Sequence, residues 1–208
     1  MTKKQSNKLL IFTKAPVLGE VKTRLQPDYS PEQSLELHKK LVIHTLTSVS
    51  KVKELNTELC CSPNRQSLFF LDCENRFPIQ LNDQLGDDLG ERMAFAISSA
   101  LQLHDKVVII GTDCPELNDQ YINEAFKALD DFDSVIGPAE DGGYVLLGLR
   151  QFSPELFSDF TWGSDSVLAQ TRKVLNDLSW SCQELGIMHD IDRPEDLLRH
   201  KEFLNDII

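Results

Sequence analysis

Apolar and polar positions along this chain alternate in blocks that predict strands followed by helices. Leu9-Leu10-Ile11-Phe12 is a short apolar run, and the segment from Glu32 to Val49 repeats apolar residues at helical spacing. Val107-Val108-Ile109-Ile110 is apolar without interruption, as expected of a strand buried on both faces of a parallel sheet. The pattern therefore predicts an α/β fold with a mostly parallel sheet flanked by helices.

The other predicted elements follow the same pattern. Further strands are expected at Glu58 to Cys61, Ser67 to Leu71, Ser134 to Ile136 and Tyr144 to Leu147. Further helices are expected at Gly90 to Leu101, Asp119 to Leu129, Ser166 to Leu178 and Pro194 to Leu204. Because ligands of such sheets bind beyond the carboxyl ends of the strands, the residues after Phe12 and after Ile110 are expected to carry the chemistry.

Length and composition predict one soluble domain. The chain has 208 residues, 41% of them hydrophobic, and it contains no internal repeat or Gly/Ser-rich linker, so a single domain over residues 1–208 is expected, with residues 1–7 as a flexible tail. No apolar run is long enough to span a membrane, and the first residues lack the apolar stretch of a signal peptide. Five cysteines without a C-x-x-C pair are typical of reduced thiols, so a cytoplasmic protein without a membrane partner is expected.

The distribution of charge points to a small anionic ligand. The formal net charge is −12, which argues against nucleic acid as a partner. Residues 1–27 nevertheless carry six Lys or Arg residues and only one acidic residue, Glu20. A local positive site in a negative protein suits a small anion better than a polyanion.

The loop after the first predicted strand is a candidate phosphate site. It contains Gly19 and the cations Lys14, Lys22 and Arg24, with Thr23 between the last two. Backbone N–H groups freed by a glycine, together with ammonium and guanidinium groups, can bind a diphosphate. The loop matches neither the P-loop nor the G-x-G-x-x-G pattern, and an ordinary surface loop explains the letters equally well.

Asp113 is the candidate metal ligand. It follows the buried strand at Val107 to Ile110, and Mg²⁺ in proteins usually takes one or two carboxylates together with substrate phosphate oxygens. Asp190 or Asp192 could supply a second carboxylate, and the sequence leaves the choice between them open. The alternatives are a turn cap at Asp113 and a helix start at Asp192.

Two further segments could contact the substrate. Glu140-Asp141-Gly142-Gly143 precedes a strand, so its carboxylates could accept hydrogen bonds from sugar hydroxyls while the glycines allow close approach of the backbone. A plain hairpin turn accounts for the same residues. Trp162 could pack against an acceptor or a base, although a core aromatic explains it as well. The histidines show no partnering pattern and are expected to be structural or solvated.

Taken together, these segments resemble the DUF2064 group, whose members are assigned as glycosyltransferases of the nucleotide-diphospho-sugar transferase superfamily, some of them linked to arsenosugar biosynthesis. The resemblance runs in order from about Lys8 to Leu198. It rests on Phe12 to Pro16 with Gly19, Lys22 to Leu25, Leu89 to Met93, Gly111 to Pro115, Gly137 to Tyr144 and Trp162 to Asp165. It implies a GT-A-type, Rossmann-like sheet, a nucleotide bound over the first loop, and a divalent metal, Mg²⁺ or Mn²⁺, at Asp113.

The resemblance leaves two reactions open. The first is glycosyl transfer, in which the metal, Lys22 and Arg24 neutralise the leaving nucleoside diphosphate of a nucleotide sugar while a small-molecule acceptor attacks, with Asp141 or Glu140 orienting the sugar or taking a proton. The second is nucleotidyl transfer, in which a phosphorylated small molecule attacks the α-phosphate of a nucleoside triphosphate and pyrophosphate is released. It is suggested by the sequence Thr112-Asp113-Cys114, which lacks D-x-D. A lone Asp paired with a distant one looks more like the guanylyltransferase of coenzyme F420 synthesis.

The sequence is compatible with a third class of function and with more than one oligomeric state. The third class is a catalytically inactive binding module with the same fold. If Asp113→Ala abolishes metal-dependent nucleotide binding, that result argues against this class. A homodimer is compatible with the sequence, which does not determine the oligomeric state.

Overall fold

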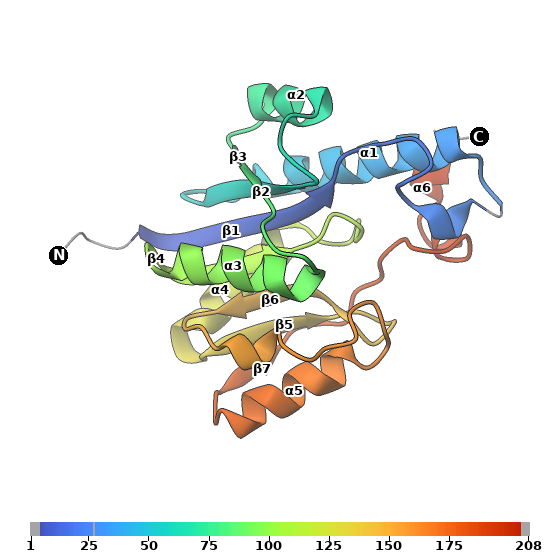
Figure 1. Ribbon diagram of the computed structural model, residues 1–208. Coiled ribbons are helices and arrows are strands. Elements are labelled where there is room, and N and C mark those ends of the chain that lie inside the picture. The colour runs from blue at the N-terminus through green and yellow to red at the C-terminus, as the bar shows by residue number, and fades with distance from the viewer. Residues whose placement is uncertain (1–4, 27, 205–208) are drawn as a thin grey trace.

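The computed structural model describes residues 5–26 and 28–204, in which strands and helices alternate along the chain (Figure 1). The strands are β1 (Gln5–Lys14), β2 (Asn56–Ser62), β3 (Gln80–Asp83), β4 (His104–Ile110), β5 (Ser134–Pro138), β6 (Tyr144–Leu149) and β7 (Cys182–Glu184). The helices are α1 (Pro31–Val49), α2 (Leu68–Arg76), α3 (Leu89–Leu101), α4 (Asp119–Asp131), α5 (Val167–Asp177) and α6 (Lys201–Leu204). Short 3-10 helices occur at η1 (Thr23–Leu25), η2 (Pro154–Leu156) and η3 (Asp196–Leu198).

The described strands form one sheet in the order β3-β2-β1-β4-β6-β5-β7. β6 runs antiparallel to both of its neighbours, whereas the other pairs are parallel, which confirms the predicted α/β fold with a mostly parallel sheet. β1 and β4 are direct neighbours, with Ile11 opposite Ile110. The loops that follow these two strands therefore leave the same edge of the sheet side by side.

Helices cover both faces of the sheet. Successive residues of a buried strand point to opposite faces, so each strand contributes to the packing on both sides. Leu9 and Ile11 of β1 belong to the hydrophobic core that packs against α1, α2 and α4. Leu10, between them, belongs to the second core, which packs against α3 and α5. The sheet is thus the middle layer of a three-layer α/β structure (Figure 1).

A third, smaller cluster attaches the C-terminal segment to the start of the chain. Its buried members are Leu25, Leu37, Leu41, Ile191, Leu197 and Phe203. In Figure 1 the blue loop after β1 and the red segment that carries α6 meet beside α1, where the members of this cluster pack together. This packing brings residues 190–193 to the loops that follow β1 and β4.

α1 begins where the sequence provides a strong helix start. The hydroxyl of Ser30 accepts a hydrogen bond from the backbone of Gln33, whose side chain accepts one from the backbone of Ser30. Pro31 occupies the first helical position, where its missing N–H costs nothing. The capping box fixes the start of the helix that carries His38 and His44.

The structure corrects the predicted strand at Ser67 to Leu71, which is the first turn of helix α2. Phe70 and Cys73, three residues apart, are buried, whereas Leu68 is 84% exposed, so the apolar run follows helical rather than strand spacing. The predicted helix from Pro194 to Leu204 is divided into η3 and α6.

The predicted flexible tail is also wrong in part, because β1 begins at Gln5 and so includes residues 5–7; residues 1–4 lie outside the described residues. All five cysteines are free thiols, and all except Cys182 are buried. Among the described helices, none combines the length and the apolar character that a membrane span requires.

Candidate active site

Lys22 lies at the centre of the site, in the loop after β1. Its backbone adopts the left-handed conformation with φ of 49°, and the next turn, η1, is anchored by the fully buried Leu25. Only 4% of the Lys22 side chain is exposed, and its Nζ lies 2.7 Å from Oδ1 of Asp113. The same Nζ donates a hydrogen bond to the backbone carbonyl of Ile191. Lys22 therefore connects the loop after β1, the loop after β4 and the C-terminal segment.

Asp113 follows β4, as predicted, and faces the cleft. Enclosure by protein atoms pushes the pKa of Asp113 upward, but the ammonium of Lys22 outweighs this effect and holds the pKa below its usual value. The backbone N–H of Ile191 donates a hydrogen bond of 2.8 Å to the carbonyl of Asp113, which ties the C-terminal segment to this loop. About half of the Asp113 side chain, 52%, remains exposed, so the ionised carboxylate is accessible to a ligand.

Arg24 and Asp192 form a second ion pair across the mouth of the cleft. The carboxylate of Asp192 raises the pKa of the Arg24 guanidinium. Both side chains are partly exposed, and exposed ion pairs contribute little to stability. Arg24 is therefore in a position to exchange Asp192 for an anionic ligand at small cost.

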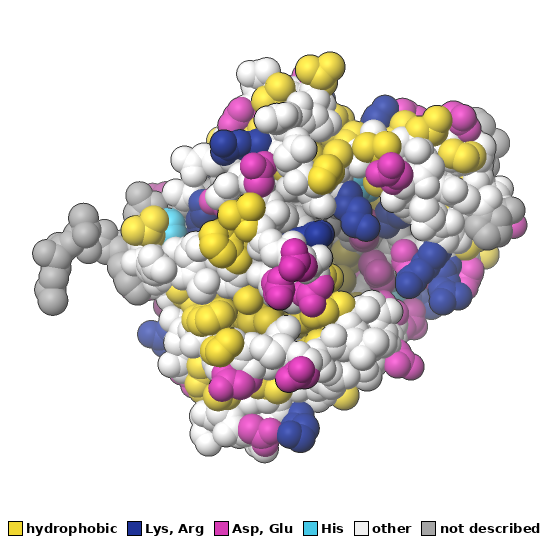
Figure 2. Space-filling view, viewed as in Figure 1, with side chains coloured by type: hydrophobic (Ala, Val, Ile, Leu, Met, Phe, Trp, Pro, Cys, Tyr) yellow, Lys and Arg dark blue, Asp and Glu magenta, His cyan; other side chains and the backbone are white. Residues whose placement is uncertain are grey.

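Three connected hollows make up the cleft. Their volumes are about 490, 330 and 390 Å³, and Arg24 and Asp192 line all three. In Figure 2, dark blue and magenta side chains gather around a hollow to the right of centre. We call the three the basic hollow, the central hollow and the acidic hollow, each defined by its lining residues below.

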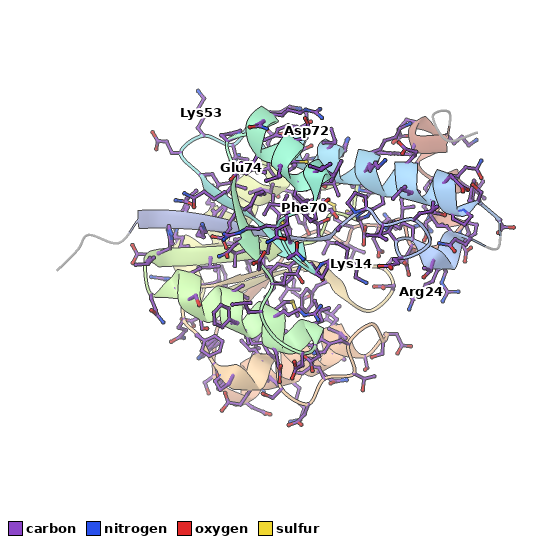
Figure 3. All side chains as sticks on the ribbon, turned by 45° about the horizontal axis from the view of Figure 1, so that its top comes forward. Lys14, Arg24, Lys53, Phe70, Asp72 and Glu74 are labelled. Carbon is purple, nitrogen blue, oxygen red and sulfur yellow. The ribbon has the colours of Figure 1, made fainter. Side chains whose placement is uncertain are left out.

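The basic hollow is lined by the predicted phosphate-binding residues Lys14, Lys22, Thr23 and Arg24, together with Asp113. Figure 3 shows Lys14 and Arg24 on the same side of the molecule, one on β1 and the other on the loop that follows it. Gly19 is not among the lining residues: it forms an outlying turn with φ of 79°, and a Cβ there would meet no heavy atom within 4 Å. The structure therefore brings the cations together and leaves Gly19 aside.

The central hollow is partly apolar and joins the two others. Its walls include Leu89, Met93, Tyr144 and Trp162, with Asp113, Asp141 and Asp190 at its polar end. Trp162 stacks on Phe160 with ring centroids 5.1 Å apart, and its indole packs so tightly on Gly90 that a Cβ there would lie 2.4 Å from Nε1. Trp162 is thus a wall of the hollow that is held from behind by aromatic packing.

The acidic hollow is lined by six carboxylates and two arginines. These are Glu140, Asp141, Asp165, Asp190, Asp192 and Asp196, with Arg24 and Arg193. Glu140 forms an ion pair with Arg199, whose guanidinium lowers the pKa of the Glu140 carboxylate. Oε2 of Glu140 also lies 3.5 Å from Nε2 of His189. Asp141 accepts a hydrogen bond from the backbone of Gly143 and faces both this hollow and the central one.

The donor set near Asp113 and Asp190 fits a hard divalent cation. Burial, followed by the charge of Asp141, raises the pKa of Asp190 to about 6, and Asp113 contributes in the same direction. Asp190 forms no ion pair within the described part of the chain, whereas Asp192 is paired with Arg24. No preformed group of three or more ligating side chains exists among the described residues. Two carboxylates with room for phosphate oxygens and water correspond to the usual habit of Mg²⁺.

Gly142 is required by the local geometry of the loop between β5 and β6. Its φ is +88°, and a Cβ there would lie 2.2 Å from the backbone oxygen of Asp165. We expect Gly142→Ala to lower the free energy of unfolding by about 2–5 kcal/mol, the sum of left-handed strain and overpacking. Urea denaturation measures the change, with Gly186→Ala as control because a Cβ at Gly186 meets nothing within 4 Å. Equal stability of the two variants would contradict this geometry.

Gln84 and His38 line the basic hollow, and neither was predicted as a site residue. The side-chain amide of Gln84 donates hydrogen bonds to the carbonyls of Thr13 (3.1 Å) and Cys60 (2.8 Å). His38 is buried on α1 and was expected to be structural or solvated. No motif surrounds either residue, and only the packing of α1 and of the loop after β3 places them here.

Comparison with solved structures identifies the class of fold. A protein from Desulfovibrio desulfuricans G20, provisionally assigned as a nucleotide-diphospho-sugar transferase, aligns with a TM-score of 0.84 and 29% identity over 94% of this chain and 85% of its own. The 4-diphosphocytidyl-2C-methyl-D-erythritol synthase of Anaerococcus prevotii DSM 20548 aligns with a TM-score of 0.61 and 13% identity over 97% and 96%. The inositol-1-phosphate CTP transferase of T. maritima aligns with a TM-score of 0.56 and 14% identity over 98% and 96%. The chain thus has the nucleotide-diphospho-sugar transferase fold.

The chain belongs to the DUF2064 family, described as an uncharacterized protein conserved in bacteria, whose family profile matches residues 45–164. This membership confirms the resemblance seen in the sequence. The structural neighbours are transferases, which supports the predicted class of enzyme. No curated protein matches the sequence.

Proposed function

We propose that this chain is a metal-dependent glycosyltransferase that uses a nucleotide-diphospho-sugar donor. The observation that carries the proposal is the convergence of Lys14, Lys22 and Arg24 with Asp113 and Asp190 in one cleft at the carboxyl edge of the sheet. Cations and a carboxylate pair at one point can bind a metal-bridged diphosphate. The similarity at 29% identity to the Desulfovibrio desulfuricans protein supports the same class of donor.

In this proposal the basic hollow holds the diphosphate of the donor. The side chains of Lys14 and Arg24 are exposed and can turn toward phosphate oxygens, whereas the ammonium of Lys22 is held by Asp113 and by the carbonyl of Ile191. Asp113 and Asp190 would hold the divalent metal, which supplies positive charge to the leaving phosphate oxygens when bound. Lys22 and Arg24 stabilise the negative charge that develops on the nucleoside diphosphate as the glycosidic bond breaks.

The sugar and the acceptor are proposed to lie in the central and acidic hollows. Trp162 offers a flat apolar wall, and Gly143, which lines the central hollow without a side chain, allows the backbone to approach the sugar. Asp141 is the best candidate to orient the sugar or accept a proton from the acceptor hydroxyl, because it faces both hollows. Glu140 suits this role less well, since Arg199 and His189 already occupy its carboxylate.

Nucleotidyl transfer is a second candidate, favoured by the position of the carboxylates. Asp113 and Asp190 come from separate segments and not from one D-x-D motif, which is the arrangement that suggests a nucleotidyltransferase. The acidic hollow supports glycosyl transfer instead, because its six carboxylates outnumber its two arginines, and this excess of negative charge repels a phosphorylated nucleophile. A hydroxyl-bearing acceptor without a phosphate meets no such repulsion.

The products of the reaction separate the two candidates. We expect incubation with a panel of nucleotide sugars, Mn²⁺ and sugar acceptors to release a nucleoside diphosphate, measured by ion-exchange chromatography. A parallel panel of nucleoside triphosphates and sugar phosphates should release no pyrophosphate. Pyrophosphate release would reverse the order of the two candidates, and the absence of both products with Mn²⁺ or Mg²⁺ would contradict the proposed class of reaction.

A further inference from the structure

Helix α1 contacts both loops of the proposed site through two histidines that the proposed function does not use. His38 is 5% exposed, and its Nε2 lies 2.9 Å from the backbone carbonyl of Lys14, where β1 ends. His44 is half-buried, and its Nε2 lies 2.9 Å from the backbone carbonyl of Pro115, two residues after Asp113. One helix thus reaches the loop that carries the cations and the loop that carries the metal carboxylate.

The direction of both hydrogen bonds follows from the acceptor. A backbone carbonyl can only accept, so each Nε2 must carry a hydrogen and donate it. For His38, burial lowers the pKa, with the Lys14 carbonyl and Asp113 acting in the opposite direction, so the ring donates as the neutral Nε2–H tautomer near pH 7. The ring of Phe203 packs edge-on against His44 with centroids 5.4 Å apart, and this contact restricts the orientation of the imidazole.

The two histidines are not needed to attach α1 to the sheet. Val42, Leu46 and Val49 pack into the core on that face of the sheet. Leu37 and Leu41 pack on Leu25 and Ile191 in the small cluster. The apolar stripe holds the helix in place, and the histidines then add two directed contacts, six residues and about 9 Å apart along the helix.

We propose that His38 and His44 are positioning residues that fix the distance between the phosphate-binding cations and the metal-binding carboxylate. His38 holds the end of β1 and therefore the loop of Lys14 and Lys22, and His44 holds the loop of Asp113. Because both are on one rigid helix, the two halves of the site keep their spacing before a ligand binds. This inference rests on the proposed function, since it assigns the histidines to the same diphosphate and metal site.

The test compares leucine and glutamine at each position. His38→Leu and His44→Leu remove the donor, whereas His38→Gln and His44→Gln keep an Nε2 donor at the same distance along the side chain. Isothermal titration calorimetry measures binding of inorganic pyrophosphate without metal, and then binding of Mn²⁺ with pyrophosphate present. If a leucine variant does not fold, methionine at the same position also lacks the donor and takes its place.

Substitutions at His38 and at His44 should affect different binding affinities. We expect His38→Leu to weaken metal-free pyrophosphate binding by about 10-fold, and His44→Leu to leave it unchanged but weaken Mn²⁺ binding by about 10-fold, with near wild-type values in the glutamine variants. Wild-type binding in both leucine variants, or the same loss of both affinities at both positions, would overturn this inference and leave the proposed function standing. A wild-type protein that binds neither pyrophosphate nor Mn²⁺ would contradict the proposed function itself, and this inference with it.

Discussion

In an Asp113→Asn variant, Mn²⁺ binding in the presence of pyrophosphate is expected to weaken by about 100-fold or more, and transfer activity to be lost. Asparagine keeps the size of the side chain but removes the charge that a divalent cation requires. Removal of a residue that only supports a metal ligand typically lowers metal affinity by about 10–100-fold, so removal of a ligand itself should reach or exceed that range. Isothermal titration calorimetry measures the affinity, and product release measures the activity.

Asp72→Asn is the matched control for this substitution. Asp72 lies on α2, away from the cleft, in an exposed ion pair with Arg76 (Figure 3). Its replacement should leave both measurements unchanged, because exposed pairs contribute little. Mn²⁺ affinity in Asp113→Asn equal to that of the control would exclude Asp113 as a ligand.

A Lys22→Met variant is expected to lose about 100-fold in kcat while remaining folded. Methionine fills most of the volume of the buried lysine stem but removes the cation that is proposed to face the leaving phosphate. Loss of one fixed electrostatic contact typically costs about 10²–10³-fold in kcat. Circular dichroism checks folding, and steady-state kinetics with a nucleotide sugar measures kcat and KM separately. Affinity for the donor should change less than kcat, because Lys14 and Arg24, the other cations proposed to bind the diphosphate, are retained.

Lys173→Met is the control for this charge change. Lys173 is an exposed residue of α5 that pairs with Asp177, and its replacement removes the same charge far from the cleft. We expect wild-type kinetics for this variant. If Lys22→Met also shows wild-type kcat, Lys22 is a structural partner of Asp113 and has no part in transfer.

The sequence predicts the buried part of the fold well, since long apolar runs and helical stripes report burial directly. β3 and β7 were missed because Gln80–Asp83 and Cys182–Glu184 are short, largely polar edge strands without a distinctive pattern. The C-terminal segment was expected to be one helix, whereas the structure divides it into η3 and α6. That segment packs on residues more than 150 positions away, and local letters do not encode such contacts.

In the candidate site, too, some residues could be predicted from the local sequence, whereas others depend on long-range packing. Lys22, Arg24 and Asp113 could be predicted because they follow neighbouring strands, whose carboxyl ends meet at one edge of the sheet. The proposed preference for Asp190 over Asp192 could not be predicted, because it depends on Arg24 pairing with Asp192 and on Asp190 being half-buried near Asp141. His38 was interpreted as structural or solvated, since a lone histidine on a helix gives no sign of the carbonyl that it contacts across the fold.

The central claim, that these cations and carboxylates bind one metal-bridged diphosphate, is tested most directly by crystals grown with Mn²⁺ and inorganic pyrophosphate. The anomalous signal of manganese locates the ion independently of any assumption about the base, sugar or acceptor. We predict one anomalous peak in contact with Asp113 and Asp190, with the pyrophosphate between that ion and the side chains of Lys14, Lys22 and Arg24. A manganese peak outside this cleft, or pyrophosphate bound elsewhere on the protein, would contradict the account.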